Sequence, residues 1–477
     1  MRKEPKINGG KEKHLPWLHM LATNNHKHWR KFLSFLPSKT ISHASTISTA
    51  SAHIFCNVGE CGNVELNIPL TWSSPPHTTP SMSSLMLPFE LVDKIISEAS
   101  SDHSSATLRA CALVCETWRA AARPYIFRKI KILDESQLAT LETLIGTDPA
   151  VGVLIRELII QPRTEPERTP SRWISRFPAV LPPHLNRLQT IQLVDLFDFG
   201  EYCNPDFFSA FSAFASVDQL ILRHCALDLR LVYSCVSALP NIRHLHVGTM
   251  LPVPYILPHA PPQLYAPQLL SIKLNVGSMY PMALEEILEW MLGSSSKDYL
   301  RSASLTTRIV NATAVGNFID ELGGLLQHLE LDFVRFSASE IEYDSESTPN
   351  LSIASFDLRH YRPVMKADIS LAKCTALRSL SFRGCNPTLP AFLAFLSEIN
   401  SPYIRKLSLW ATSSGADRAI LPDFRVLVEQ LDSRHLRGLE EVCFTYRGPL
   451  QRAFVLEKLQ RDLPNVDSRG ILRLVMT

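Results

Sequence analysis

The residues best suited to metal chemistry are histidines and cysteines at short spacings. His244 and His246 alternate along a strand-like pattern, which places both imidazoles on one face. Cys111 and Cys115 stand four residues apart in a helical pattern, which also places two side chains together. Neither pair has further ligands nearby, whereas a zinc site needs about three or four protein ligands. We therefore expect no metal and no cofactor, and core packing for the two thiols.

The rest of the sequence offers little for catalysis. His53, Cys56 and Cys61 lack the second paired cluster that zinc modules have. There is no Gly-x-Ser-x-Gly elbow, no Gly-rich phosphate loop followed by Lys-Ser/Thr, and no His-Glu-x-x-His. Because no nucleophile–base pair is visible, we expect no catalytic residues and predict that the protein is not an enzyme. The remaining alternative is an active site within the long loops.

Composition limits the classes of partner. The chain has 477 residues, of which 45% are hydrophobic and 20% charged, and these values are typical of a globular protein. Its 48 basic and 46 acidic residues leave a formal net charge of +2. Such a balance predicts neither a nucleic-acid nor a membrane partner. No apolar run is long enough to span a membrane, so we expect a cytoplasmic or nuclear protein.

Residues 1–84 differ from the remainder. They are rich in Lys, His, Ser, Thr and Asn and have few periodic apolar positions, which predicts a disordered extension and linker. The basic, weakly amphipathic stretch 28–36 leaves two alternatives open, an organellar targeting segment or a surface-binding arm. The Ser/Pro/Thr run at 73–81 is a linker by composition.

A small helical module is predicted at 85–130. A first helix begins near Pro88, where the missing N–H is no loss, and carries Leu91 and Ile95 on one face. A second is expected over 106–123, with Trp118 on its apolar stripe and Pro124 ending it. The module is too small for a large core of its own, so its apolar richness predicts a partner that covers one side.

These residues resemble an F-box, particularly the form common in fungal proteins. The resemblance covers roughly 45 residues and lies in four segments in the expected order, which are Leu87-Pro88-x-Glu90-Leu91, Ile95, Leu113-Val114-Cys115-x-x-Trp118-Arg119 and Ala122-Arg123-Pro124-x-x-Phe127-Arg128. It implies docking onto the Skp1 adaptor of a cullin–RING ubiquitin ligase while the rest of the chain captures a protein substrate. The Skp1-docking candidates that it implies are Pro88, Leu91, Ile95, Val114, Cys115 and Trp118. Several of them are equally explained as core residues.

An internal repeat fills most of the remaining chain. The pattern apolar-x-x-apolar-x-apolar begins at Ile155, Leu188, Val217, Ile242, Leu269, Leu300, Leu326, Ile353, Leu377, Ile404 and Leu439. Subtraction of these numbers gives spacings of 24 to 35 residues, near the period of about 20–29 residues of leucine-rich repeats. Helix-like segments lie between the matches. We therefore predict the α/β class: a helical module followed over 131–477 by an irregular leucine-rich-repeat solenoid with a parallel sheet.

Alternate positions of each predicted strand point away from the core and form a polar surface. That set comprises Gln192, Gln219, Arg223, His244, His246, Lys273, His328, Glu330, Asp332, Asp357, Arg359, Arg383, Lys406 and Trp410. The mixture of both charge signs suits a protein partner better than a phosphate backbone. We take Arg223, His246, Lys273, Glu330, Arg359, Arg383 and Trp410 as substrate-facing candidates. The alternative is that they are ordinary solvated strand residues. The hypothesis is thus an adaptor of an SCF-type ligase, and its rival is a non-ligase repeat scaffold with the helical module as an end cap.

Overall fold

The structure of the protein is a computed structural model. The residues that it describes are 87–101, 105–163, 173–196, 205–225, 229–248, 267–275, 281–307, 311–333, 369–384, 389–412 and 423–477. The chain divides into two compact units, residues 1–131 and 132–477. We call them the helical unit and the repeat unit.

The helical unit contains three short helices in its described residues. They are α4 (Phe89–Ser101), α5 (Ser105–Ala112) and α6 (Glu116–Phe127). Pro88 immediately precedes α4, and its carbonyl accepts the N–H groups of Leu91 and Val92 at 3.0 and 3.2 Å. A proline suits this place because the first N–H groups of a helix have no partner inside the helix.

The repeat unit is built on one sheet whose strands follow sequence order from β1 to β12, and β1 spans the boundary between the two units. Each pairing from β2 to β12 is parallel. The strands are β1 (Lys129–Ile132), β2 (Glu157–Ile160), β3 (Thr190–Val194), β4 (Gln219–Arg223), β5 (His244–Val247), β6 (Ser271–Asn275), β7 (Ser302–Thr307), β8 (His328–Phe333), β9 (Ser379–Gly384), β10 (Lys406–Thr412), β11 (Glu441–Arg447) and β12 (Leu472–Met476). This arrangement confirms the predicted α/β class with a parallel sheet.

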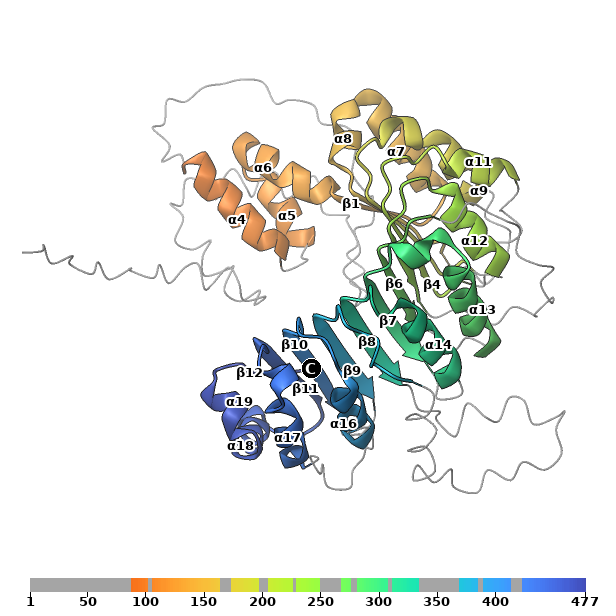
Figure 1. Ribbon diagram of the computed structural model, residues 1–477. Helices are drawn as coiled ribbons and strands as arrows, with labels where there is room; N and C mark the ends of the chain where they lie inside the picture. Colours follow the sequence, from red (N-terminus) through yellow and green to blue (C-terminus); the bar gives the residue numbers. More distant parts are fainter. Residues whose placement is uncertain are drawn as a thin grey trace, which may run out of the picture. The chain divides into compact units, whose positions relative to one another are not determined.

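Helices connect the strands and follow one side of the sheet (Figure 1). Short 3-10 turns at 182–184, 295–298, 424–427 and 434–436 complete several of the connections. The helices are α7 (Glu135–Thr147), α8 (Pro149–Leu154), α9 (Trp173–Val180), α11 (Pro205–Phe211), α12 (Leu229–Ala238), α13 (Pro281–Leu292), α14 (Ala312–Leu322), α16 (Leu389–Glu398), α17 (Val428–Leu431), α18 (Arg452–Asp462) and α19 (Pro464–Ser468).

Each described match of the repeated apolar pattern places its three apolar residues in the core, apart from Leu409, which is only partly buried. In the second match, Leu188 precedes β3, while Ile191 and Leu193 point from the strand toward the helices, and all three are fully buried. The parallel register aligns equivalent residues of neighbouring strands, so Ile191 pairs with Leu220 and Leu193 with Leu222. Stacking the repeats therefore produces continuous apolar rows that no single repeat could bury.

A repeated backbone contact fixes the register at the start of each strand. The carbonyl of Arg156 accepts the N–H groups of Gln189 and Thr190 at 2.9 and 3.0 Å. The same double contact recurs at successive repeats, including the step from β8 to β9, where Gln327 accepts from Arg378 and Ser379 at 2.7 and 3.0 Å. One residue in each repeat thus satisfies two donors of the next.

The strands differ from the expected set at three places. β8 pairs directly with β9, so no strand stands between them, and the predicted match at 353–358 lies outside the described residues. β1 and β12 were not predicted. β1 fits the pattern as Phe127-x-x-Ile130-x-Ile132, but Phe127 also belongs to the helical module. β12 lacks the first apolar position because Arg469 occupies it.

Candidate interaction surfaces

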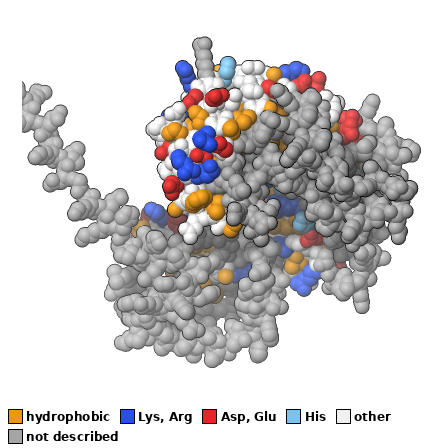
Figure 2. All heavy atoms as spheres, turned by 90° about the horizontal axis from the view of Figure 1, so that it is seen from below, with side chains coloured by type: hydrophobic (Ala, Val, Ile, Leu, Met, Phe, Trp, Pro, Cys, Tyr) orange, Lys and Arg blue, Asp and Glu red, His pale blue; other side chains and the backbone are white. Residues whose placement is uncertain are grey.

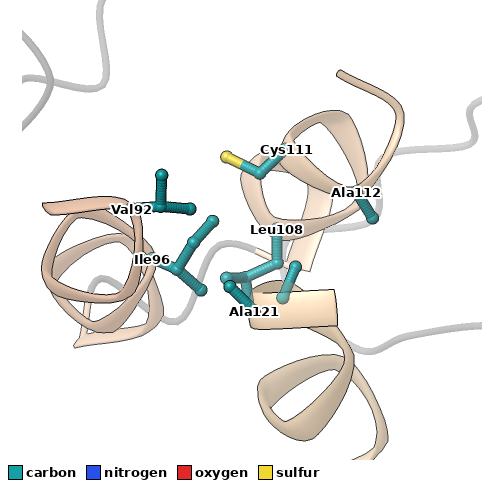
Figure 3. Close-up of a cluster of buried hydrophobic side chains, with 7 residues drawn as sticks. Val92, Ile96, Leu108, Cys111, Ala112 and Ala121 are labelled. Carbon is teal, nitrogen blue, oxygen red and sulfur yellow. The ribbon is translucent and has the colours of Figure 1, made fainter. Parts of the chain in front are cut away.

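The helical unit has a small core between its three helices. Figure 3 shows Val92 and Ile96 of α4 directed toward Leu108 and Cys111 of α5, with Ala121 of α6 beside them. Burial raises the pKa of the Cys111 thiol, so it stays protonated and packs as a small apolar group. The core side chains are few and small, so this unit by itself buries little apolar surface.

The second predicted helix is interrupted. α5 ends at Ala112, the chain turns through Leu113 and Val114, and Cys115 adopts an extended conformation before α6 begins. The carbonyl of Cys115 then accepts the N–H of Arg119 at 2.9 Å, which starts the new helix. The prediction of one helix over 106–123 was therefore wrong. The interruption turns Leu113 and Val114 outward instead of into the core.

Pro124 does not end the second helix, as the sequence had suggested. It lies inside α6, which continues to Phe127. Proline removes one N–H donor and crowds the preceding turn, so it usually ends or kinks a helix. Here the backbone stays helical through it, and only Arg128 separates α6 from β1.

Large apolar side chains are exposed on the outside of this unit. Val92 is 1% exposed in the core, whereas its neighbour Leu91 is 47% exposed. The turn after α5 adds Leu113 and Val114, which are 73% and 64% exposed. Leu87 and Phe89 at the start of α4 are also exposed. We call Leu87, Phe89, Leu91, Leu113 and Val114 the outer apolar set. Contiguous exposed apolar surface marks sites of protein association.

The predicted docking residues occupy different environments. Pro88, Leu91, Val114 and Cys115 are exposed, and Ile95 is partly exposed beside Leu91. Trp118 packs against the core and is only partly accessible. Leu87, Phe89 and Leu113 were not among the candidates. Adjacent apolar residues such as Leu113-Val114 were the signal for these exposed positions. Neighbouring residues of a helix point in different directions, so a narrow core face does not cover both.

The repeat unit presents a polar face on the side of the sheet opposite the buried rows. The parallel register joins one residue from each strand into a middle row, namely Ile159, Gln192, Ile221, His246, Lys273, Ser304, Glu330, Ser381, Ser408, Cys443 and Arg473. Three of the predicted substrate-facing residues, His246, Lys273 and Glu330, therefore lie in this single row. Arg359 lies outside the described residues, as does Asp357.

One predicted position is not exposed. Gln192 is buried, and its side-chain amide donates to the carboxylate of Glu157 on the neighbouring strand. Ile159 and Ile221 flank it in the row and are also buried. The alternation of side chains along a strand predicts which face of the sheet a residue lies on, but not whether neighbouring side chains cover it. The prediction that Gln192 is exposed was therefore wrong.

Arg383, Trp410 and Glu330 form one connected cluster near the middle of the polar face. The Arg383 guanidinium carbon lies 3.8 Å from the centre of the Trp410 ring, and its Nε lies 2.6 Å from Glu330 Oε1 as an ion pair. Ser304 donates its hydroxyl to Glu330 Oε2 at 2.9 Å. The register places Asp332 beside Arg383. Burial raises the pKa of Asp332, Arg383 opposes that shift, and Glu330 adds to it.

A basic group lies a few strands away and consists of Arg223, His246 and Lys273. Burial, followed by the charges of Lys273 and then Arg223, lowers the pKa of His246 to about 4, so its imidazole is neutral near pH 7. His244 lies two residues earlier and bonds Ser271 Oγ through Nδ1 at 2.7 Å. The described residues contain no group of three or more His, Cys, Asp or Glu that could hold a metal ion.

The buried thiols of the repeat unit are poor nucleophiles. Burial raises the pKa of Cys225 and that of Cys374 to about 12. The Cys225 Sγ also lies 3.3 Å from the carbonyl oxygen of Leu193, which holds it inside the repeat. Reactive cysteines are instead accessible and have lowered pKa values. These two side chains therefore serve packing.

Charges elsewhere on the surface are mixed. In Figure 2, basic, acidic and apolar side chains are intermingled over the described part of the surface in view. Many are paired, such as Lys297 with Glu321 at 2.7 Å and Arg405 with Glu440 at 3.0 Å. Among the helices that the structure describes, none has the length and apolarity needed to cross a membrane.

Comparison with known proteins gives no family. No protein family matches the sequence. No curated protein matches it either. Among solved structures, one similar chain belongs to the crystal structure of the Rad7 and Elc1 complex in yeast, with a TM-score of 0.31 and 12% identity over 79% of this chain and 86% of that chain. At this TM-score the two chains share too little geometry for the likeness to bear on function.

Proposed function

We propose that this chain is a non-catalytic substrate-recognition adaptor of an SCF-type cullin–RING ubiquitin ligase. The helical unit docks a Skp1-like adaptor, and the polar face of the repeat unit holds a protein substrate. The observation that carries the proposal is the outer apolar set, which lies on the segment whose sequence resembles an F-box.

The outer apolar set supports docking because a partner would remove it from water. Each Å² of apolar surface that becomes buried contributes about 25 cal/mol. The small core of Val92, Ile96, Leu108 and Cys111 already uses the inner faces of the helices. The outward side chains have no role in that core, and an interface core is where such residues contribute most. Leu91 and Val114 are thus the strongest anchors of the implied docking set.

The polar face supports binding rather than catalysis. The residues of its middle row stand on paired strands and include polar side chains of both charge signs. Arg383 is held against Trp410 and Glu330, so its side chain is already ordered before a partner arrives. Prior order of this kind lowers the entropy lost on association. Arginine and tryptophan are also the residue types that most often dominate interfaces.

The test is capture of Skp1 by the full chain carrying Leu91→Arg and Val114→Arg. Both side chains are exposed, so the fold should persist, which circular dichroism and thermal unfolding would verify. A hot-spot residue costs about 2 kcal/mol or more, which is about thirtyfold in affinity, so the loss of even one of the two predicts at least about thirtyfold weaker binding by surface plasmon resonance. Trp118 is less suitable because it packs on the core.

A matched control carries Val426→Arg and Phe454→Arg, which replace two exposed apolar residues of the repeat unit. This variant should bind Skp1 as the wild type does. Unchanged Skp1 binding by the folded Leu91/Val114 variant, or no binding by the wild-type chain, would count against the assignment.

The alternative function is a repeat scaffold in which the helical unit serves as an end cap. One observation favours it: a single residue, Arg128, connects α6 to the edge strand β1. Deletion of residues 87–127 leaves β1 in place. If the helical unit is a cap, the repeats should lose much of their thermal stability. If it is a docking module, they should unfold near the original temperature while Skp1 binding disappears.

A further inference from the structure

Charged residues in the later repeats of the polar face are mostly paired with neighbours. Lys406 lies 2.9 Å from Glu441, Arg473 lies 3.4 Å from the same carboxylate, and Arg383 pairs with Glu330. Arg223 and Lys273 differ, since neither forms an ion pair with any residue that the structure describes. Both are exposed at the surface. Among the described residues, Arg223 and Lys273 therefore present positive charge without an ion-pair partner.

The register brings Arg223, His246 and Lys273 together. His246 pairs with Lys273 on one side and with Ile221 on the other, and Arg223 follows two residues after Ile221. Since neighbouring strands lie about 4.8 Å apart and residues rise about 3.3 Å along a strand, the three Cα atoms fall within roughly 12 Å. An extended peptide of about four residues covers that distance.

Gly248 allows the Arg223 side chain to take this position. A Cβ atom at residue 248 would lie 3.1 Å from Arg223 Cγ and 3.2 Å from the carbonyl oxygen of Leu222. Contacts this short require one neighbour to shift. The absence of a side chain at Gly248 therefore leaves room for the Arg223 side chain beside β5, the strand that carries His246.

The basic group places positive charges close together. Burial is the largest cause that lowers the pKa of His246 to about 4, and the nearby charges of Lys273 and then Arg223 lower it further, so both cations act at that point. An anion placed between the three side chains would interact favourably with both permanent cations. His246 would supply a ring N–H donor even when neutral.

The extent of the group limits the size of the anion. Ile221 and Gln192 continue the row on one side and are buried. On the other side, two strands beyond Lys273 and about 10 Å away, Glu330 already pairs with Arg383, so that cation is not free for the anion. Nucleic-acid binding uses about 6–10 phosphate contacts over a longer basic surface, which two permanent cations do not provide.

We propose that Arg223, His246 and Lys273 bind a short acidic segment, rich in Asp and Glu, of the protein captured by the repeat unit. This deepens the proposed function, because the acidic segment would belong to the ligase substrate. The carboxylates would pair with Arg223 and Lys273, and an imidazole N–H of His246 would donate to one of them. Because Arg383 is already paired with Glu330, the segment would be confined to the earlier repeats.

The experiment measures binding of a fluorescein-labelled peptide of alternating Glu and Ser to the full chain by fluorescence anisotropy. The same peptide with Gln in place of Glu is the comparison probe. We expect the Glu peptide to bind more tightly, with an affinity that falls as salt rises. Arg223→Glu with Lys273→Glu should weaken binding at least about tenfold. A charge-matched control, Arg437→Glu with Arg447→Glu, reverses two exposed residues elsewhere and should bind as the wild type does.

Several outcomes would overturn the inference. These are equal affinity for the Glu and Gln peptides, equal affinity of the wild type and the Arg223/Lys273 variant, no Glu-peptide binding up to about 1 mM, or binding only of a phosphoserine peptide or a DNA duplex. Skp1 capture by the same variants separates this result from the proposed function. It should be unchanged, and its failure in the wild type would refute the ligase role without altering the peptide measurements.

Discussion

The helical unit and the repeat unit use apolar side chains in opposite ways. In the repeat unit the apolar positions of successive strands align into rows that the helices cover, so repeats bury one another. In the helical unit, adjacent residues of α4 differ in burial, with Val92 in the core and Leu91 exposed. Stacking buries the apolar rows of one unit, while the other leaves part of its apolar surface exposed. Stability and binding should therefore respond to apolar truncation in different places.

The largest expected effect is in the aromatic core of the early repeats. Phe177, Phe207 and Phe211 form a fully buried cluster with ring centres 5.5 to 6.3 Å apart. Phe211→Ala should lower the free energy of unfolding by about 3–5 kcal/mol, because it leaves a cavity and removes apolar contacts. Urea unfolding monitored by circular dichroism gives the value.

Truncation to alanine at exposed apolar positions provides the contrast with the buried Phe211. Phe454→Ala in α18, Leu91→Ala and Val114→Ala should each change the unfolding free energy by no more than about 0.5 kcal/mol. A loss at Leu91 similar to that at Phe211 would mean that Leu91 belongs to a core, and the contrast between the units would fail.

The next largest effect concerns two glycines of the first repeat. A Cβ at Gly152 in α8 would lie 2.4 Å from the carbonyl oxygen of His184, a backbone atom that cannot rotate away. Gly152→Ala should therefore destabilise the repeat unit by about 1–3 kcal/mol. Gly146 lies in α7, and a methyl group at this position would meet no other atom within 4 Å, so Gly146→Ala should stabilise the unit by about 0.5–1 kcal/mol. Thermal unfolding of both variants tests whether close packing between repeats sets stability.

A smaller effect is expected for the Arg383–Trp410 pair. The guanidinium stacks on the ring at 3.8 Å, and such contacts contribute about 0.5–1 kcal/mol at accessible sites. A double-mutant cycle with Arg383→Gln and Trp410→Leu should give a coupling energy in that range. Coupling indistinguishable from zero would show that the cluster is held by the ion pair with Glu330 alone.

The last effect is the contribution of His246 to the pH dependence of stability. Its folded-state pKa is about 4, below its ordinary value of 6.5, because of burial and the charges of Lys273 and Arg223. The unfolded chain thus takes up a proton first, and the stability due to neutral His246 is lost as pH falls from 6.5 toward 4. An NMR titration of the imidazole should show this low pKa, and Lys273→Gln should raise it. An unperturbed titration would remove the evidence for a positive potential there.

Much of the repeat unit could be predicted because its signal is periodic. Each match of the pattern within the described residues supplies three buried side chains, except that Leu409 is only partly buried, and a strand formed at every one of these matches. Spacing alone did not reveal where the sheet ends. Phe127 completes the pattern for β1 yet lies in α6, and a helical residue and a strand-flanking one look alike in sequence.

The helical unit was harder to predict because its structure depends on where the chain changes direction, and no repeated spacing of apolar residues marks that point. An unbroken helix through Leu113, Val114 and Cys115 satisfies local propensity, yet the chain turns there. Gln192 illustrates the same limit on the polar face: its burial depends on Glu157 and Ile221, which come from other repeats. Local pattern predicts the element, while neighbours distant in sequence decide how each side chain is used.

The strand order has a consequence for how the protein is made. Because each strand pairs with the one that precedes it in the chain, every new repeat finds its template already synthesised. The sheet can therefore grow one step at a time as the polypeptide leaves the ribosome, without waiting for its carboxyl end. A chain released early would carry an unpaired terminal strand, an exposed edge open to aggregation.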